Sequence, residues 1–343
     1  MLALSRWSLI CLAALLCQSG CAYIGLLPAP VYLPKPIPTA KDCYTRADWD
    51  KVCTAFQTRT LDQAYETCSA HDPSWDDAAR SYIKTWRETL TGEGRWLSYE
   101  ELGHGGESLI DAGCDDPIVL YLTGITLHES YQFSEAASLL RRAVDAFKSS
   151  QHPRARTAYA AARLAAVLKQ IGGETRKEAE ENARLAIQWI LESARDGSYL
   201  DGEQRLMLLN VEEVGDIMWL DARADLYEAL KACPDVHPYV TAVTGGRLYI
   251  DKAWESRGTG WASTVTEEGW RGFRDSLEIA RELLADAWEA YPDYPEAPSD
   301  LIVIAKANAA VPADMGRLWF DRAVAAAAIL GFEQIEHPHH TVV

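Results

Sequence analysis

The segment FRDSLEIARELLADA, residues 273–287, decides the fold of this 343-residue chain. Its small and apolar residues recur every three or four positions, as Phe273, Leu277, Ala280, Leu284 and Ala287. That spacing places the five side chains on one side of an α-helix. Because alanine is small, a neighbouring helix can approach this side closely, at the short end of the usual ~8–10 Å between helix axes. The segment therefore predicts a helix that belongs to a stack of helix pairs.

The same spacing continues toward the C-terminus. A second set of small and apolar residues is formed by Gly316, Phe320 and Ala323. We expect this set to face a neighbouring helix, so that a helix over 314–328 pairs with one over 298–309.

A related pattern occurs earlier in the chain. Gly124 is followed twelve residues later by Ala136, and then by Leu140 and Ala143. This spacing resembles the tetratricopeptide repeat, a 34-residue helix pair with a small residue in its first helix and alanine, a bulky residue and alanine in its second. The resemblance extends over residues 117–328. It implies an all-α fold, an α-solenoid of tetratricopeptide-like helix pairs.

Two further pairs match the repeat less closely. Ala179, Ala183 and Ala186 are expected on the second helix of one pair, whose first helix lies within 154–170. Residues 198–235 have helical periodicity but match the repeat poorly, so we interpret them as a degenerate pair.

The pair that contains the opening segment is longer than the repeat. Its first helix should contain Gly246, which precedes Ala280 by 34 residues instead of twelve. We interpret the excess as an insertion that runs from Arg257 to Trp270.

Four residues at this insertion are candidate ligand-binding residues: Trp254, Glu255, Arg257 and Trp261. They combine aromatic faces, a fork-shaped cation and a carboxylate beside flexible glycines, a mixture suited to a peptide or a sugar. The alternative is that both tryptophans pack in the core while Glu255 and Arg257 pair with other residues or cap helix ends.

Residues 253–258 (AWESRG) and 319–323 (WFDRA), together with the opening segment, resemble a family of secreted bacterial proteins and lipoproteins related to tetratricopeptide-repeat proteins. That family supplies no activity to transfer. Tetratricopeptide-like domains usually bind peptides or protein surfaces along a concave groove. The resemblance therefore implies a protein or peptide partner.

The first 22 residues have the pattern of a signal peptide. An eleven-residue run from Trp7 to Cys17, apolar except for Ser8, follows Arg6. A helix that spans a membrane needs roughly 20 apolar residues, so this run is too short to be one. We therefore expect export to the periplasm or cell envelope.

The end of this leader suggests a lipid anchor. Residues 17–21 (CQSGC) resemble the lipobox of bacterial lipoproteins, which implies acylation of Cys21 as the first mature residue. Gln18 departs from the pattern, which prefers leucine there. Ordinary cleavage after Ala22 is the alternative. If Cys21 is acylated, we expect that lipid to be the only attachment to a membrane.

The leader is followed by a tether and a helical region. Five prolines between 28 and 38 predict an extended tether over 23–40. The helical N-terminal region is expected over 41–115. Within it, the run Gly103-His104-Gly105-Gly106 predicts a loop between helices, either a flexible connector or part of the lining of a pocket. Helices are expected near 46–57, 60–70 and 74–90.

Most cysteines outside the leader lie in this region. They are Cys43, Cys53, Cys68 and Cys114. In an oxidising compartment we expect one or two disulfides among them, with Cys233 buried and free. The sequence has no Cys-x-x-Cys spacing, so we expect no metal site.

Catalytic signatures are incomplete or missing from the sequence. His128-Glu129 begins a metalloprotease-like pattern, but Gln132 stands where the second zinc-binding histidine belongs. The serine-hydrolase elbow, the phosphate-binding loop and the calcium loop are also missing. Several histidines lie in a tail over 329–343, which we expect to be disordered. We therefore expect neither catalysis nor a cofactor.

The charge of the chain excludes one class of partner. Asp and Glu number 50 against 33 Lys and Arg, which gives a net charge of −17. A surface this acidic repels the phosphate backbone of nucleic acids. We therefore expect no binding to nucleic acid.

Two functional classes remain. The first is a non-catalytic scaffold in the bacterial cell envelope that binds proteins or peptides. The second is a small-ligand-binding or hydrolytic envelope protein whose site is the 254–270 insertion together with the 103–106 run. A closed pocket with converging Glu, Arg and Trp side chains would favour the second class.

Overall fold

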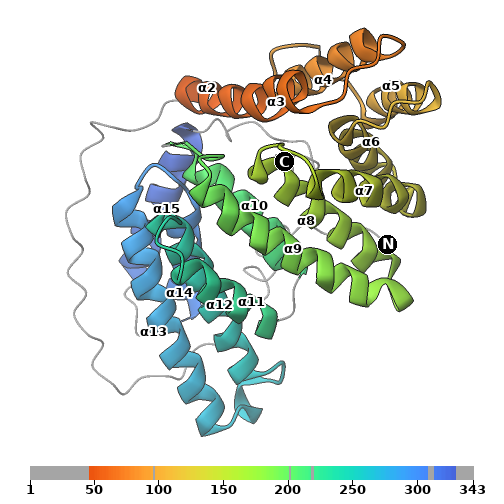
Figure 1. The fold of residues 1–343 in the computed structure, drawn as a ribbon. Helices are drawn as coiled ribbons and strands as arrows, with labels where there is room; N and C mark the ends of the chain where they lie inside the picture. Colours follow the sequence, from red (N-terminus) through yellow and green to blue (C-terminus); the bar gives the residue numbers. More distant parts are fainter. Residues whose placement is uncertain (1–45, 96, 201, 218–219, 308–312, 330–343) are drawn as a thin grey trace. The chain divides into compact units, whose positions relative to one another are not determined.

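The structure, a computed structural model, describes residues 46–329 except 96, 201, 218–219 and 308–312 (Figure 1). This part of the chain is helical throughout and contains no strand. The expected all-α class is therefore confirmed. The leader, Cys21, the tether, Cys43 and most of the 329–343 tail lie outside the described residues.

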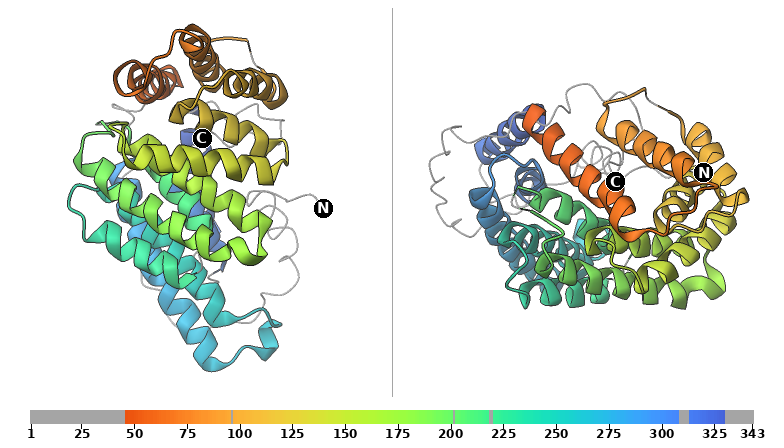
Figure 2. Two further views of the ribbon diagram at one scale, coloured as in Figure 1. Left: turned by 45° about the vertical axis from the view of Figure 1, so that its right-hand side comes forward. Right: turned by 45° about the horizontal axis from the view of Figure 1, so that its top comes forward.

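Helices that follow one another in the sequence pack as adjacent pairs. Figure 2 shows α6 to α10 lying side by side. The pairs are α6 (Pro117–Glu129) with α7 (Phe133–Lys148), α8 (Arg154–Ile171) with α9 (Arg176–Arg195), α10 (Gln204–Ile217) with α11 (Leu220–Lys231), α12 (Pro238–Arg257) with α13 (Glu267–Ala290), and α14 (Glu296–Ala307) with α15 (Ala313–Ile329).

Local sequence signals set the ends of these helices. Asp116 caps α6 by accepting hydrogen bonds from the backbone N–H groups of Ile118 (2.9 Å) and Val119 (3.2 Å), and Pro117 takes the first helical position. Gly172 ends α8 at a φ of +72°, a conformation that favours glycine.

Glycines bring paired helices into close contact. A Cβ atom on Gly124 would lie 2.7 Å from Cγ of Leu140, and one on Gly246 would lie 2.5 Å from Cγ of Leu284. No side chain fits at either glycine without displacing the leucine. Both pairs thus repeat one contact, in which a bulky residue of the second helix packs on a glycine of the first.

The buried side of α13 is the one that the opening segment predicts. Phe273, Leu277, Ala280, Leu284 and Ala287 are all buried. This prediction is confirmed.

The corresponding prediction for α15 is partly wrong. Phe320 is half exposed, whereas its neighbour Trp319 is buried and lies edge-on against Trp288 of α13 at 5.7 Å. The guanidinium of Arg322 lies 4.0 Å from the Trp288 ring centre. The buried face is therefore rotated by one residue, because Trp319 and not Phe320 meets the neighbouring helix.

The N-terminal region is helical as expected. Its elements are α2 (Arg46–Gln57), a π-helical segment η2 (Thr58–Gln63), α3 (Ala64–Cys68), α4 (Asp76–Thr91) and α5 (Tyr99–Asp111).

The expected loop at 103–106 is wrong, because these residues lie inside α5. The Ser98 side chain accepts a hydrogen bond from the Glu101 backbone, and the Glu101 carboxylate accepts one from the Ser98 backbone, which starts the helix. A Cβ on Gly106 would lie 2.1 Å from Oγ1 of Thr123 in α6. The glycine therefore lets two helices touch, and that packing outweighs its low helix propensity.

The expected disulfides are also wrong for the described cysteines. Cys53, Cys68 and Cys114 are free thiols, and the Cys68 thiol donates to the backbone carbonyl of Gln151 at 3.4 Å. Burial raises the pKa of Cys53 to about 12 and that of Cys114 to about 11, so both remain protonated. Cys233 is buried and free, as predicted.

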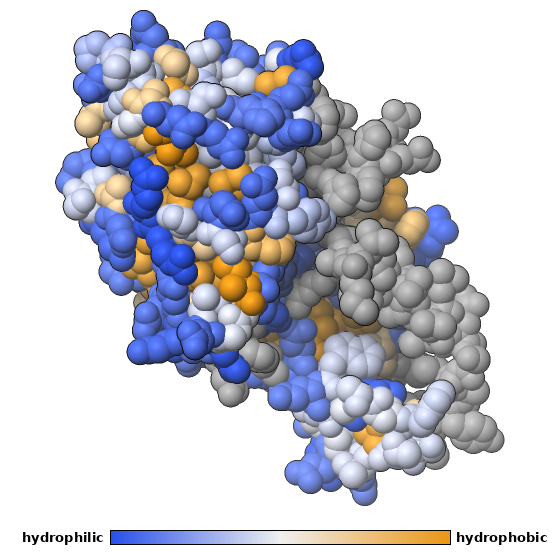
Figure 3. Space-filling model, turned by 90° about the vertical axis from the view of Figure 1, so that its right-hand side faces the viewer, coloured by the Kyte–Doolittle hydropathy of each residue, from blue (hydrophilic) through white to orange (hydrophobic). Residues whose placement is uncertain are grey.

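The chain forms two compact units. Among the described residues, one comprises 46–245 together with 327–329 and the other Gly246–Ala326. The boundary falls within α12, so the expected N-terminal region and the first helix pairs belong to one unit. On the face shown in Figure 3, apolar residues form patches separated by hydrophilic ones. No described helix has the length and apolarity needed to span a bilayer.

Candidate functional site

The candidate ligand-binding residues lie at the end of the α12–α13 hairpin. Trp254, Glu255 and Arg257 belong to the last turn and a half of α12, and Trp261 belongs to the link that joins it to α13. All four lie within the second compact unit.

This hairpin is longer than the α6–α7 pair because its helices are longer. Gly246 precedes Leu284 by 38 residues, whereas Gly124 precedes Leu140 by 16. Most of the excess lengthens α12 beyond Gly246 and α13 before Ala280, and the link itself covers only 258–266. The extra spacing is therefore mainly an extension of two helices, whereas the expected 257–270 insertion consists mostly of the link, with Trp270 in the first turn of α13.

Arg257 holds the link in place. Its Nη1 donates to the backbone carbonyls of Gly258 (3.0 Å) and Gly260 (3.3 Å). Its guanidinium carbon lies 5.7 Å from the ring centre of Trp254 and 5.5 Å from that of Trp270. These distances permit cation–π contact with both rings. Arg257 thus fits the alternative in which it caps a helix end.

The aromatic residues below the link are packed together. Trp254 and Trp270 both lie edge-on to the buried ring of Phe273, at 5.1 and 5.7 Å between ring centres. The sequence interpretation did not select Trp270 as part of this cluster. Its position three residues before Phe273 on one helix was the available signal.

Trp261 differs from the other residues of the cluster. Its side chain is 85% exposed, compared with 41% for Trp254. The alternative in which both tryptophans pack in the core is therefore wrong for Trp261, and Trp254 is only partly covered. Its backbone carbonyl accepts hydrogen bonds from the backbone N–H and the hydroxyl of Thr264, both at 2.8 Å. The hairpin thus presents an exposed indole on an ordered turn.

This arrangement can provide contact area for a partner. Glu255 is exposed on α12, and the described Arg257 hydrogen bonds go to the link's own carbonyls. Trp and Arg are among the residue types enriched at the positions that contribute most to protein interfaces.

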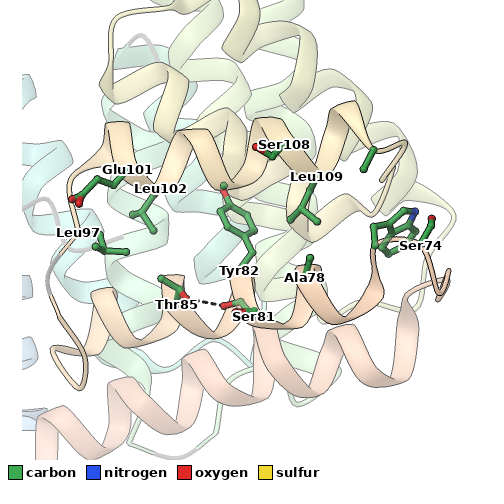
Figure 4. Close-up of a pocket in the computed structure, with 13 residues that line it drawn as sticks. Ser74, Ala78, Ser81, Tyr82, Thr85, Leu97, Glu101, Leu102, Ser108 and Leu109 are labelled. Atoms are coloured by element: carbon green, nitrogen blue, oxygen red, sulfur yellow. Dashed lines mark hydrogen bonds between the residues drawn. The ribbon is translucent and has the colours of Figure 1, made fainter.

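A separate shallow groove of about 390 Å³ lies between α4 and α5 (Figure 4). Leu102 and Leu109 of α5 point toward Ala78 and Tyr82 of α4. Gly105 also lines the groove, so the 103–106 run does line a pocket, although as part of a helix.

Several polar groups around this groove are already engaged in hydrogen bonds. The Thr85 hydroxyl donates to the Ser81 carbonyl at 2.8 Å, and the Ser108 hydroxyl donates to the His104 carbonyl at 2.7 Å. Hydrogen bonds from Ser98 hold the pKa of Glu101 below its ordinary value. Glu101 is therefore an ionised capping residue and not a general acid.

His128 and Glu129, which begin the incomplete metalloprotease-like pattern, lie beside the buried Arg163. Arg163 lies 3.2 Å from the carboxylate of Glu129 and 2.9 Å from that of Glu213. Burial lowers the pKa of His128, and the charge on Arg163 lowers it further. Within the described ranges, no group of three or more His, Cys, Asp or Glu side chains is arranged to bind a metal ion.

Comparison of the sequence with models of known protein families and with curated proteins gives no match.

Proposed function

We propose that this protein is a non-catalytic scaffold that binds a protein or peptide partner in the bacterial cell envelope. The leader pattern supports export, and the lipobox-like segment supports anchoring through acylated Cys21. The adjacent helix pairs and the repeated Gly–Leu contact support a tetratricopeptide-like α-solenoid over 117–328.

The main observation in favour of binding is the exposure of Trp261. The Trp261 indole is 85% exposed at the end of a lengthened hairpin. A partner can therefore cover it without first breaking apolar contacts within the free protein. Its burial by that partner would contribute favourable free energy, and the ordered link keeps the entropy cost of binding low. In this proposal Trp261 contacts the partner, whereas Arg257 and Trp254 hold the link in position.

The alternative, a small-ligand-binding or hydrolytic protein, has less support. It requires Glu, Arg and Trp side chains that converge in a closed pocket, but Trp261 and Glu255 are exposed and Arg257 is engaged with Gly258 and Gly260.

The test is affinity capture from native membranes with the full chain as bait. Trp261→Ala should reduce the amount of captured partner roughly tenfold or more, because a central Trp usually contributes about 2 kcal/mol or more to an interface. Phe320→Ala is the matched control, since it removes a half-exposed aromatic ring elsewhere on the same unit. It should leave capture unchanged. Both variants should keep the wild-type helical circular-dichroism signal, and equal capture by all three proteins would eliminate the hairpin end as the site.

A further inference from the structure

One face of α8 has a stripe of buried polar residues. Arg156, Tyr159 and Arg163 follow one another at spacings of three and four, so they lie on the same side of the helix. α7 and α9 also pack against α8. The later part of this stripe meets neighbouring helices, because the Tyr159 hydroxyl donates to the Leu206 carbonyl of α10 (3.0 Å) and Arg163 pairs with Glu129 of α6 and Glu213 of α10.

Here the chain's own N-terminal segment covers the first half of this stripe. Nη2 of Arg156 donates to Oε1 of Gln57 (2.6 Å) and to Oγ1 of Thr60 (2.8 Å). The guanidinium carbon lies 5.7 Å from the ring centre of Phe56 and 5.6 Å from that of Tyr159. Arg156 is only 1% exposed as a result. The segment that covers it, residues 46–63, comprises α2 and η2.

The same segment has two anchors of the kind found at protein interfaces. Phe56 stacks on Tyr199 at 5.6 Å between ring centres and 11° between planes. Arg59 forms a bidentate pair with Glu203 (3.0 and 2.6 Å) and also donates to the Ser198 carbonyl at 2.8 Å. An aromatic ring on a matching ring and a forked cation on a buried carboxylate are features of ligand recognition.

The contact also has features that weaken it. Among the described residues no carboxylate forms an ion pair with buried Arg156, whose contacts are an amide, a hydroxyl and aromatic rings. Burying a charge with neutral partners alone costs free energy, which is recovered when the site opens to water. The contact residues also include Thr60 in the π-helical segment Thr58–Gln63, a form that is rare and often occurs at functional sites.

We propose that residues 46–63 are an intramolecular ligand that occupies a binding face formed by α8 and by Ser198, Tyr199 and Glu203 before α10, and that a partner helix displaces them. That helix would present an aromatic residue and an arginine three positions apart, as Phe56 and Arg59 do. The proposal rests on the proposed scaffold function and adds the class of partner and a means of regulation: the face is closed until a partner competes for it.

Native-state hydrogen exchange of the full chain tests whether the segment opens by itself. Amides of 46–63 should exchange through openings roughly a hundredfold more frequent than those of α6 and α8. Arg59→Ala should raise the exchange rate of the 46–63 amides about tenfold above that of the wild type and leave the rates in α6 and α8 unchanged. Arg141→Ala is the matched control, because it removes another bidentate pair, with Glu178 at 2.5 and 2.8 Å, and should not affect 46–63.

A labelled synthetic peptide of residues 46–63 then tests whether the face accepts a ligand. It should bind the Arg59→Ala chain roughly tenfold more tightly than the wild type, and a peptide with alanine at both anchors should bind neither. Equal protection of 46–63 and α8 in the wild type, or no peptide binding to the opened variant, would overturn the proposal. Both measurements omit the cellular partner, so they can fail while capture through Trp261 succeeds, and the reverse.

Discussion

His152 is a buried histidine with few partners. Its side chain is 3% exposed, lies edge-on to Phe147 at 5.2 Å and contacts the Ser69 hydroxyl at 3.4 Å. Burial lowers its pKa to about 4, whereas an unfolded histidine titrates near ~6.5. The folded state therefore excludes a proton that the unfolded state binds between these two values.

This difference predicts a pH-dependent stability. Because the unfolded chain binds more protons, the free energy of unfolding should fall as pH decreases from about 6.5 to about 4, by about 2–3 kcal/mol from this residue. Urea unfolding at several pH values measures it. In His152→Gln that share of the pH dependence should disappear, and the difference between the two proteins cancels the other titrating groups. A slope unchanged by the substitution would mean that His152 is hydrated in solution.

At the scale of single elements, α5 shows most clearly that helix packing can outweigh the low helix propensity of glycine. A Cβ on Gly106 would lie 2.1 Å from Oγ1 of Thr123 and 2.6 Å from the hydroxyl of Tyr82. A Cβ on Gly103 would meet only ordinary contacts, the nearest at 3.4 Å to Thr126. The two glycines occupy one helix but differ in the space around them.

Alanine substitutions should therefore have opposite effects. Gly106→Ala should destabilise the protein by about 2–3 kcal/mol, because Tyr82 and Thr123 must move. Gly103→Ala should be neutral or stabilise it by up to about 1 kcal/mol, since alanine favours helix over glycine. Chemical denaturation measures both values. If the two variants were equally stable, α5 would not pack on α6 as described.

At the scale of the whole molecule, the division into two units predicts which helices lose stability when a core residue is truncated. Leu284 packs on Gly246 in the second unit, and Leu140 packs on Gly124 in the first. Both leucines are fully buried. In stacked helix pairs each pair contacts mainly its neighbours, so a defect weakens the nearest pairs most.

Leu284→Ala should cost about 2–5 kcal/mol and reduce hydrogen-exchange protection in α13 and α14 more than in α6 to α9. Leu140→Ala is the counterpart and should give the reverse pattern. Hydrogen exchange resolved along the chain measures both. A uniform loss of protection in either variant would show that the chain unfolds as one unit.

The sequence by itself determined the all-helical class and most of the helices. Apolar periodicity predicted the buried side of α13, and the small residues at repeat spacing, such as Gly124 and Ala136, predicted closely packed helix pairs. Both are short-range properties, because the period of the helix fixes which side chains share a face. The residue types at the hairpin end also identified a candidate site.

Only the tertiary structure decided which of those residues are free and which are engaged. Phe320 and Trp319 are adjacent aromatic residues, and contact with Trp288 selects the one that is buried. Trp261 is exposed and Arg257 is engaged for a similar reason, since exposure depends on what the rest of the chain leaves uncovered. The contact between residues 46–63 and α8 joins positions about a hundred residues apart, and no local pattern encodes such a pairing.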